Sequence, residues 1–241
     1  MELESGFDFT SSTGGKGGIS RKGGISVWQA QLALRMSFLR KVYGILAAQL
    51  LLTVAVCALY MYVPSVRSYA QQSPVLALST LVVTVIVLLA LMYKRHDSPM
   101  NYCLLLAFTV LESVSLGTIV TYYDQSTVFE AFFITAVVFM ALTSYTMQSK
   151  YDFSTWGASL FSFLLVLIVA GLFQLIFGGG PFEMVLSVGG ALLFCGYIIF
   201  DTHLIMHKLS PEDYIVASVN LYLDVINLFL YVLRILDALK K

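Results

Sequence analysis

Charged residues are scarce in this chain: Asp, Glu, Lys and Arg together make up 12% of its 241 residues, with no net charge. Ordinary soluble domains are about a quarter charged. Hydrophobic residues make up 59% of the chain, which is more apolar surface than a soluble core of this length needs. The composition excludes an ordinary soluble domain, gives no basis for a nucleic-acid partner, and indicates an integral membrane protein.

Cysteine and proline are also rare, and their positions suit apolar membrane-spanning segments. All three cysteines (Cys57, Cys103 and Cys195) lie inside apolar stretches, so a disulfide framework of an extracellular domain is not expected. The five prolines lie between apolar stretches or at their edges, where a missing N–H costs least. No segment alternates at period two for the roughly 10 residues that a barrel strand requires, which favours helices.

Seven stretches are apolar over the roughly 20 residues that cross a bilayer. They cover residues 42–63, 75–93, 101–122, 128–147, 157–177, 182–206 and 214–236. We therefore predict an all-α membrane domain over residues 27–241, with seven helices. Residues 1–26 are rich in Gly, Ser and Thr and predict a disordered cytosolic tail. The basic residues 27–41 predict either a helix on the membrane surface or a basic flank of the first span.

Lys and Arg are distributed unevenly between the two sides of this scheme. They gather in the N-terminal region and in the second, fourth and sixth connections, whereas the other connections hold only Arg67. The positive-inside rule then predicts a cytosolic N-terminus. Seven full crossings would place Lys240 and Lys241 on the far side, so two alternatives remain open: the last segment spans the membrane, or it re-enters and returns.

Three carboxylates lie deep in the apolar stretches: Glu112, Asp201 and Asp224. Each costs at least about 2.5–3.5 kcal/mol at a helix centre, so each should face protein or water. At 100° per residue, a polar stripe surrounds Asp224 on its helix, and Tyr197 shares the face of Asp201. The stripe comprises Asp213, Asn220, Asn227 and Tyr231. We predict Glu112, Asn220, Asn227 and Tyr197 as supporting polar lining.

Asp201 and Asp224 are predicted to meet. A short connection makes their helices antiparallel neighbours. At 1.5 Å per residue, Asp201 lies about 8 Å before the end of its helix and Asp224 about 15 Å after the start of the next, so both acids lie on the same side of the membrane's middle. Two adjacent carboxylates in a low dielectric share a proton, and deprotonation recruits a hard cation such as Ca²⁺ weakly and transiently. Alternatives are polar contacts that only hold helices together, or the acid pair of an intramembrane protease.

Three stretches carry a family resemblance: residues 36–53 (MSFLRKVYGILAAQLLLT), 191–214 (ALLFCGYIIFDTHLIMHKLSPEDY) and 217–236 (ASVNLYLDVINLFLYVLRIL). They resemble the lifeguard branch of the transmembrane Bax-inhibitor-motif family. The resemblance implies six helices around a central one. It assigns a di-aspartyl pH sensor to Asp201 and Asp224, and a further acid near the ion path to Asp213.

The function that the resemblance implies is a Ca²⁺ leak or channel of Golgi or endoplasmic reticulum membranes, tied to resistance to apoptosis. On that view the protein is no enzyme and holds no tightly bound cofactor, and Ca²⁺ is its permeant ion. The alternative is a non-conducting anti-apoptotic adaptor. Its partners would be membrane proteins that regulate apoptosis or conduct calcium.

Overall fold

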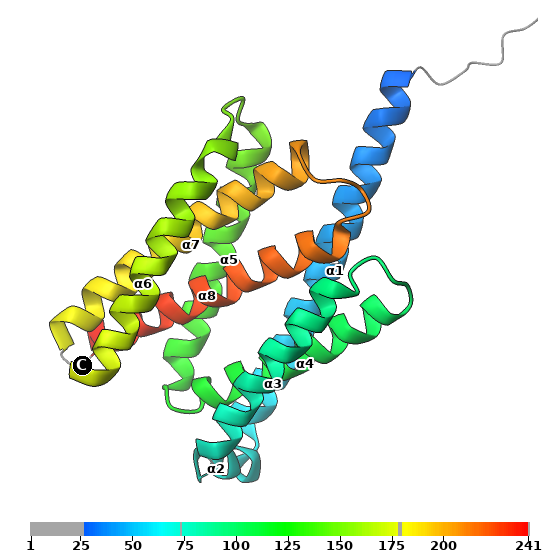
Figure 1. Ribbon diagram of the computed structural model, residues 1–241. Coiled ribbons are helices and arrows are strands. Elements are labelled where there is room, and N and C mark those ends of the chain that lie inside the picture. The colour runs from blue at the N-terminus through cyan, green and yellow to red at the C-terminus, as the bar shows by residue number, and fades with distance from the viewer. Residues whose placement is uncertain (1–26, 73, 178–179, 241) are drawn as a thin grey trace, which may run out of the picture.

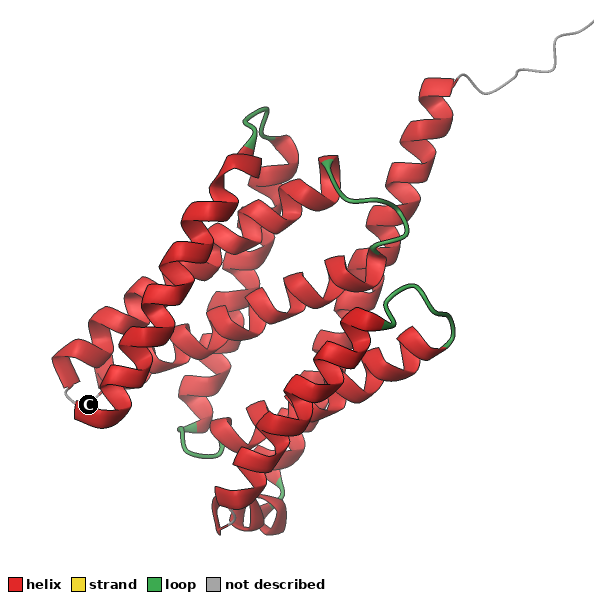
Figure 2. Ribbon diagram, in the orientation of Figure 1, coloured by secondary structure: helices red, strands yellow, loops and turns green. Residues whose placement is uncertain are grey.

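Figure 1 shows the computed structural model, which describes residues 27–72, 74–177 and 180–240. Within these ranges the chain forms helices joined by short loops, with no strand, as Figure 2 shows. The predicted tail of residues 1–26 lies outside the described residues. The elements are α1 (Val27–Tyr62), α2 (Pro64–Gln72), α3 (Pro74–Tyr93), α4 (Met100–Val120), α5 (Gln125–Gln148), the 3₁₀ helix η1 (Phe153–Trp156), α6 (Gly157–Phe177), α7 (Gly180–His207) and α8 (Tyr214–Lys240).

The all-α prediction is confirmed, and each predicted span falls largely within a helix of its own, with the largest difference at α1, which begins 15 residues before its predicted span. Of the described helices, α1, α4, α5, α6, α7 and α8 are long and apolar enough to cross a membrane. In α3, the stretch Ser79–Tyr93 is apolar but shorter than those six. The chain is thus a multi-span membrane protein by the length and composition of its helices.

Helix α1 decides between the two alternatives for residues 27–41. These residues continue without a break into the first predicted span, giving one helix of 36 residues, so a separate helix bent onto the membrane surface is wrong. The sequence offers no reason for a bend, because its first glycine after residue 27 is Gly44 and no proline intervenes. In this extension, Arg35 donates from Nε to Met206 O and from Nη1 to Leu209 O, both at 2.6 Å. It thereby satisfies carbonyls at the end of α7.

Helix α2 is an element that the hydropathy pattern does not predict, because it is short and polar. Pro64 opens it, as suits a first helical position, where the missing N–H has no helical partner to lose. Arg67 and Gln71 both donate to Thr121 O, at 2.9 and 2.8 Å. The helix therefore ties the end of α1 to the end of α4.

Helix α8 lies in the middle of the bundle (Figure 1) and packs against α1, α5 and α7. In its most apolar stretch 61% of the residues are buried, whereas in that of α6 the share is 6%. A helix that is apolar on most of its circumference needs protein or lipid on all sides. Helix α8 finds protein there, and α6 leaves most of its surface for lipid.

The alternative of a re-entrant last segment can be compared directly with α8. This helix runs unbroken for 27 residues, or about 40 Å at 1.5 Å per residue, without a turn inside its described length. At its far end, Lys240 Nζ lies 2.9 Å from Glu130 Oε2 and donates to Thr127 Oγ1 at 3.1 Å. Both partners belong to the first turns of α5, so α8 traverses the bundle from one end to the other.

Candidate functional site

The carboxyl groups of Asp201 in α7 and Asp224 in α8, the acid pair, are neighbours, close enough for a hydrogen bond between them. Their residues are 7% and 5% exposed. Ionised carboxylates only accept hydrogen bonds, so a hydrogen bond between the two would require a proton on one of them. The structure thus brings the two predicted acids together in the interior.

A cavity of about 620 Å³, here the α6–α8 cavity, opens beside the acid pair. Helices α6, α7 and α8 each supply part of its wall. Its lining residues are Leu164, Leu167, Ile168, Gly171, Phe194, Tyr197, Phe200, Asp201, Asn220, Leu223, Asp224, Asn227 and Tyr231. The wall contributed by α6 is entirely apolar, so the polar groups of the cavity all come from the last two helices.

The polar stripe predicted on α8 faces this cavity. Asn220, Asp224, Asn227 and Tyr231 all line it. Asn227 Nδ2 donates to Leu223 O at 2.8 Å, which leaves the amide oxygen of Asn227 as an acceptor for other donors or for a cation. The stripe therefore combines carboxylate and amide oxygens, the ligand types that hard cations prefer.

The aromatic rings of Phe194, Tyr197 and Tyr231 also line the α6–α8 cavity. Phe194 lies between two tyrosines, with centroid distances of 5.8 Å to Tyr197 and 5.9 Å to Tyr231. Gly190 makes the position of Tyr231 possible, because a Cβ atom there would approach the Tyr231 ring to 2.5 Å. The absence of a side chain on α7 thus lets the end of the α8 stripe pack closely.

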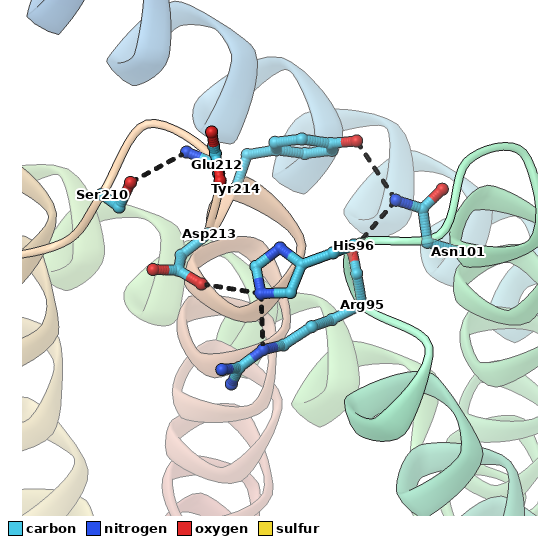
Figure 3. A network of polar contacts seen from close by, with 7 residues as sticks. All are labelled: Arg95, His96, Asn101, Ser210, Glu212, Asp213 and Tyr214. Carbon is cyan, nitrogen blue, oxygen red and sulfur yellow. Dashed lines mark hydrogen bonds and ion pairs between the residues drawn. The ribbon is translucent and has the colours of Figure 1, made fainter.

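Asp213 lies outside the α6–α8 cavity, at the start of α8. Figure 3 shows its surroundings: Asp213 Oδ1 lies 3.6 Å from His96 Nε2, to which Arg95 Nε donates at 3.0 Å. In the same network Asn101 Nδ2 donates to Arg95 O at 3.0 Å and to Tyr214 Oη at 3.2 Å. The loop between α3 and α4 thus holds Asp213, some 16 Å along the helix from Asp224 at 1.5 Å per residue.

Glu112 is not among the residues that line the α6–α8 cavity. It is half-buried on α4, and α4 packs mainly against α1 and α3 rather than against α7. A helical-face argument places a residue relative to its own helix and not relative to the others. Glu112 as supporting polar lining therefore stays a prediction, and the structure places it away from the acid pair's cavity.

One contact at the end of α7 joins residues that the sequence did not pair. His203 is 6% exposed, and its Nε2 lies 2.9 Å from Asp152 Oδ1. Asp152 also accepts from Ser154 N at 2.9 Å and opens η1. Hydrogen bonds from Ser154 lower the pKa of the Asp152 carboxyl to about 2. The local signal for this turn is an Asp two residues before a Ser, but nothing local points to the histidine.

Metal ligation by a preformed cluster finds no support in the part of the chain that the structure describes. There, no group of three or more His, Cys, Asp and Glu side chains is placed to hold an ion. The acid pair offers two carboxyl groups, with the Asn220 and Asn227 amides on the same wall. Such a wall is suited to transient contact with a passing ion rather than to a tight site.

Comparison with known proteins identifies the family. A profile described as "Inhibitor of apoptosis-promoting Bax1" matches residues 35–241. The chain belongs to the Bax inhibitor/lifeguard family. The Golgi anti-apoptotic protein of Vaccinia virus (strain Lister) is 49% identical over 218 residues, which cover 90% of this chain and 92% of the viral protein.

Cellular members of the Bax inhibitor/lifeguard family are also similar. Protein lifeguard 4 of Mus musculus is 46% identical over 218 residues, covering 90% of this chain and 92% of that protein. Bax inhibitor 1 of Schizosaccharomyces pombe is 42% identical over 210 residues, covering 87% of this chain and 79% of that protein. The resemblance found in the sequence is confirmed, and the matched region includes the acid pair and all the lining residues.

Proposed function

We propose that this chain is a pH-sensitive Ca²⁺ leak of Golgi membranes, and also of the endoplasmic reticulum, that lowers store calcium and restrains apoptosis. The observation that carries the proposal is a pair of neighbouring buried carboxyl groups on the wall of a cavity inside a multi-span bundle. The names of the relatives support the biological part, since the viral relative is named for the Golgi and for opposing apoptosis. The proposed role is transport and not catalysis.

Protons and Ca²⁺ compete for the same oxygens in this proposal. With one proton, the acid pair satisfies itself and carries one negative charge. Without it, both carboxylates repel each other and bind a hard cation better. The other titratable groups on the cavity wall are Tyr197 and Tyr231, and α6 contributes only apolar residues. Ca²⁺ occupancy, and with it flux, should therefore rise as the pH rises.

Asp213 has a supporting role in the proposal. The N-terminus is cytosolic by the distribution of Lys and Arg, α3 crosses with the six longer helices, and Asp213 then lies at the cytosolic mouth. A carboxylate there raises the local concentration of cations.

The test is Ca²⁺ flux through purified full-length protein in indicator-loaded liposomes between pH 5 and 8. We expect the wild-type rate to rise with pH. Asp224→Asn should lose this dependence and conduct about tenfold less, the change that follows from about 1.4 kcal/mol of lost ion interaction. Glu130→Gln is the control, because it removes a carboxylate that pairs with Lys240 far from the cavity.

Unchanged flux through Asp224→Asn at every pH would contradict the leak mechanism. The adaptor alternative makes a different prediction, because an adaptor protects cells without conducting. If wild-type liposomes show no flux above protein-free liposomes while the same protein still protects cells from an apoptotic stimulus, the adaptor role is correct.

A further inference from the structure

The α6–α8 cavity is larger and more apolar than a path for Ca²⁺ requires. Its volume of about 620 Å³ falls within the roughly 300–1,000 Å³ of sites that enclose organic ligands. One wall consists of Leu164, Leu167, Ile168 and Gly171 of α6. Bare apolar walls offer nothing to a hydrated ion. They are suited to a hydrocarbon body.

The opposite wall is suited to a positively charged group. Asp224 is 5% exposed, and its Oδ2 receives no hydrogen bond from the described residues. On the same wall, the Phe194 ring lies within 6 Å of both the Tyr197 ring and the Tyr231 ring. Ring faces and carboxylates together are the groups that bind organic ammonium ions.

Among the helices that line the cavity, α6 is the one with the most surface open to the bilayer. This helix packs on α7 and η1, and scarcely on α8. It is also the described span with the least buried surface. A molecule dissolved in the bilayer therefore meets α6 first, and passes between α6 and α8 to reach the acid pair.

We propose that the α6–α8 cavity binds a lipophilic amine, with its ammonium group at Asp201 and Asp224 and its hydrocarbon body against α6. A single-chain amine is favoured over a phospholipid with an ammonium headgroup, because a phosphate beside two acids would be repelled. The bound ammonium replaces the shared proton and excludes Ca²⁺ from the same oxygens. This ligand site goes beyond the proposed leak and does not require that the protein conduct.

Gly171 provides a variant that fills the cavity without disturbing the acid pair. A Cβ atom added at Gly171 meets nothing within 4 Å, although the residue lines the cavity. Gly189 of α7 is equally free of neighbours and does not line it. Leucine at either position raises helix propensity by about 1 kcal/mol, so both variants should fold.

The experiment measures saturable binding of radiolabelled dodecylamine to full-length protein in phosphatidylcholine nanodiscs, without Ca²⁺ or an ion gradient. We expect Gly171→Leu and Asp224→Asn each to weaken binding at least about tenfold, the loss of one good contact, and Gly189→Leu to leave it unchanged. Dodecanol, which lacks the charge, should compete at least about tenfold less well than the amine. Phosphatidylethanolamine added to the nanodiscs should not displace the amine.

A photoreactive analogue of dodecylamine locates the site independently of any variant. Labelling is expected on α6 between residues 164 and 171 and on α8 between residues 220 and 231. Equal competition by amine and alcohol, or equal binding by Gly171→Leu and wild type, would overturn the proposal, since either result means general partitioning. Displacement by phosphatidylethanolamine would overturn the choice of a single-chain amine. Because no step involves flux, these outcomes are independent of whether the leak exists.

Discussion

Asp152 and His203 form a contact between an exposed residue and a buried one that lie far apart in the sequence. The Asp152 carboxylate is on the surface, yet it contacts an imidazole that is 6% exposed. Because hydrogen bonds from Ser154 lower the pKa of Asp152 to about 2, this carboxylate stays ionised throughout the neutral and mildly acidic range. It therefore holds the loop after α5 against the end of α7.

Replacing Asp152 by Asn should lower the thermal unfolding temperature by a few degrees at pH 6. A carboxyl group whose pKa is lowered by folding stabilises the protein above its ordinary value of 3.8, and that contribution is lost as the pH falls through about 2. The difference between variant and wild type should thus disappear between pH 4 and pH 2. Circular dichroism in detergent measures it.

Asp97→Asn is the matched control for this change. Asp97 pairs with Lys94 at 2.8 Å in an exposed position, where such pairs contribute little, so its unfolding temperature should match that of wild type. A destabilisation by Asp152→Asn that persists unchanged at pH 2 would show that ionisation of Asp152 is not the cause.

At the scale of helices, α1, α4 and α8 are joined by a buried hydroxyl cluster. Thr53 Oγ1 lies 2.9 Å from both Ser113 Oγ and Tyr222 Oη. Thr53 is 2% exposed, and the other two are fully buried. Where water is absent, such bonds must be complete, because an unpaired buried hydroxyl costs about 1–3 kcal/mol. The cluster fixes the register of the central helix against α1 and α4.

We expect Tyr222→Phe to reduce the free energy of unfolding by about 1 kcal/mol, for one lost hydrogen bond. Thr53→Val should cost more, because it leaves the Tyr222 hydroxyl buried without a partner. The double variant should be less destabilised than the sum of the two by about 0.5–1.5 kcal/mol. Unfolding by SDS in mixed micelles measures all three.

Thr146→Val is the control for the hydroxyl cluster, because the Thr146 hydroxyl is also buried but donates to Leu142 O of its own helix. Thr146→Val should reduce the free energy of unfolding only slightly, and its effect should add to that of Tyr222→Phe. Additivity between Thr53→Val and Tyr222→Phe themselves would show that the two hydroxyls stabilise the helices independently.

At the scale of the whole molecule, the path of α8 decides the topology. Just before α8, Asp213 contacts His96 in the loop after α3. At the other end of α8, its last residue, Lys240, contacts Glu130 near the start of α5. These contacts lie at opposite ends of one unbroken helix. The two ends of α8 should therefore be on opposite sides of the membrane.

Cysteine labelling tests this topology. In a background where Cys57, Cys103 and Cys195 are replaced by Ala, Ser210→Cys should react with an impermeant maleimide added to the cytosolic side of sealed vesicles. Lys240→Cys should react only after the vesicles are permeabilised. Both positions are exposed, so buried thiols do not confuse the result. Equal labelling from the cytosolic side would mean that the last segment turns back.

Hydropathy and helix periodicity were sufficient to predict the long apolar helices but not the short polar α2, because the cost of moving a residue into lipid depends on local composition. They also identified the stripe on α8 and the pairing of Asp201 with Asp224, since a short connection leaves antiparallel neighbours little freedom. Residues 27–41 left two alternatives open, because a basic amphipathic stretch suits either a surface or a continuing helix.

What the sequence determined by itself is that this is a helical membrane protein with acids that must find protein or water. Only the tertiary structure decided which groups meet them: Glu112 lies outside the α6–α8 cavity, and Asp152 reaches His203 across 51 positions. The reason is physical. The hydrophobic cost of a residue is a local property, whereas a contact depends on which helices pack together and on the volume that their side chains leave between them.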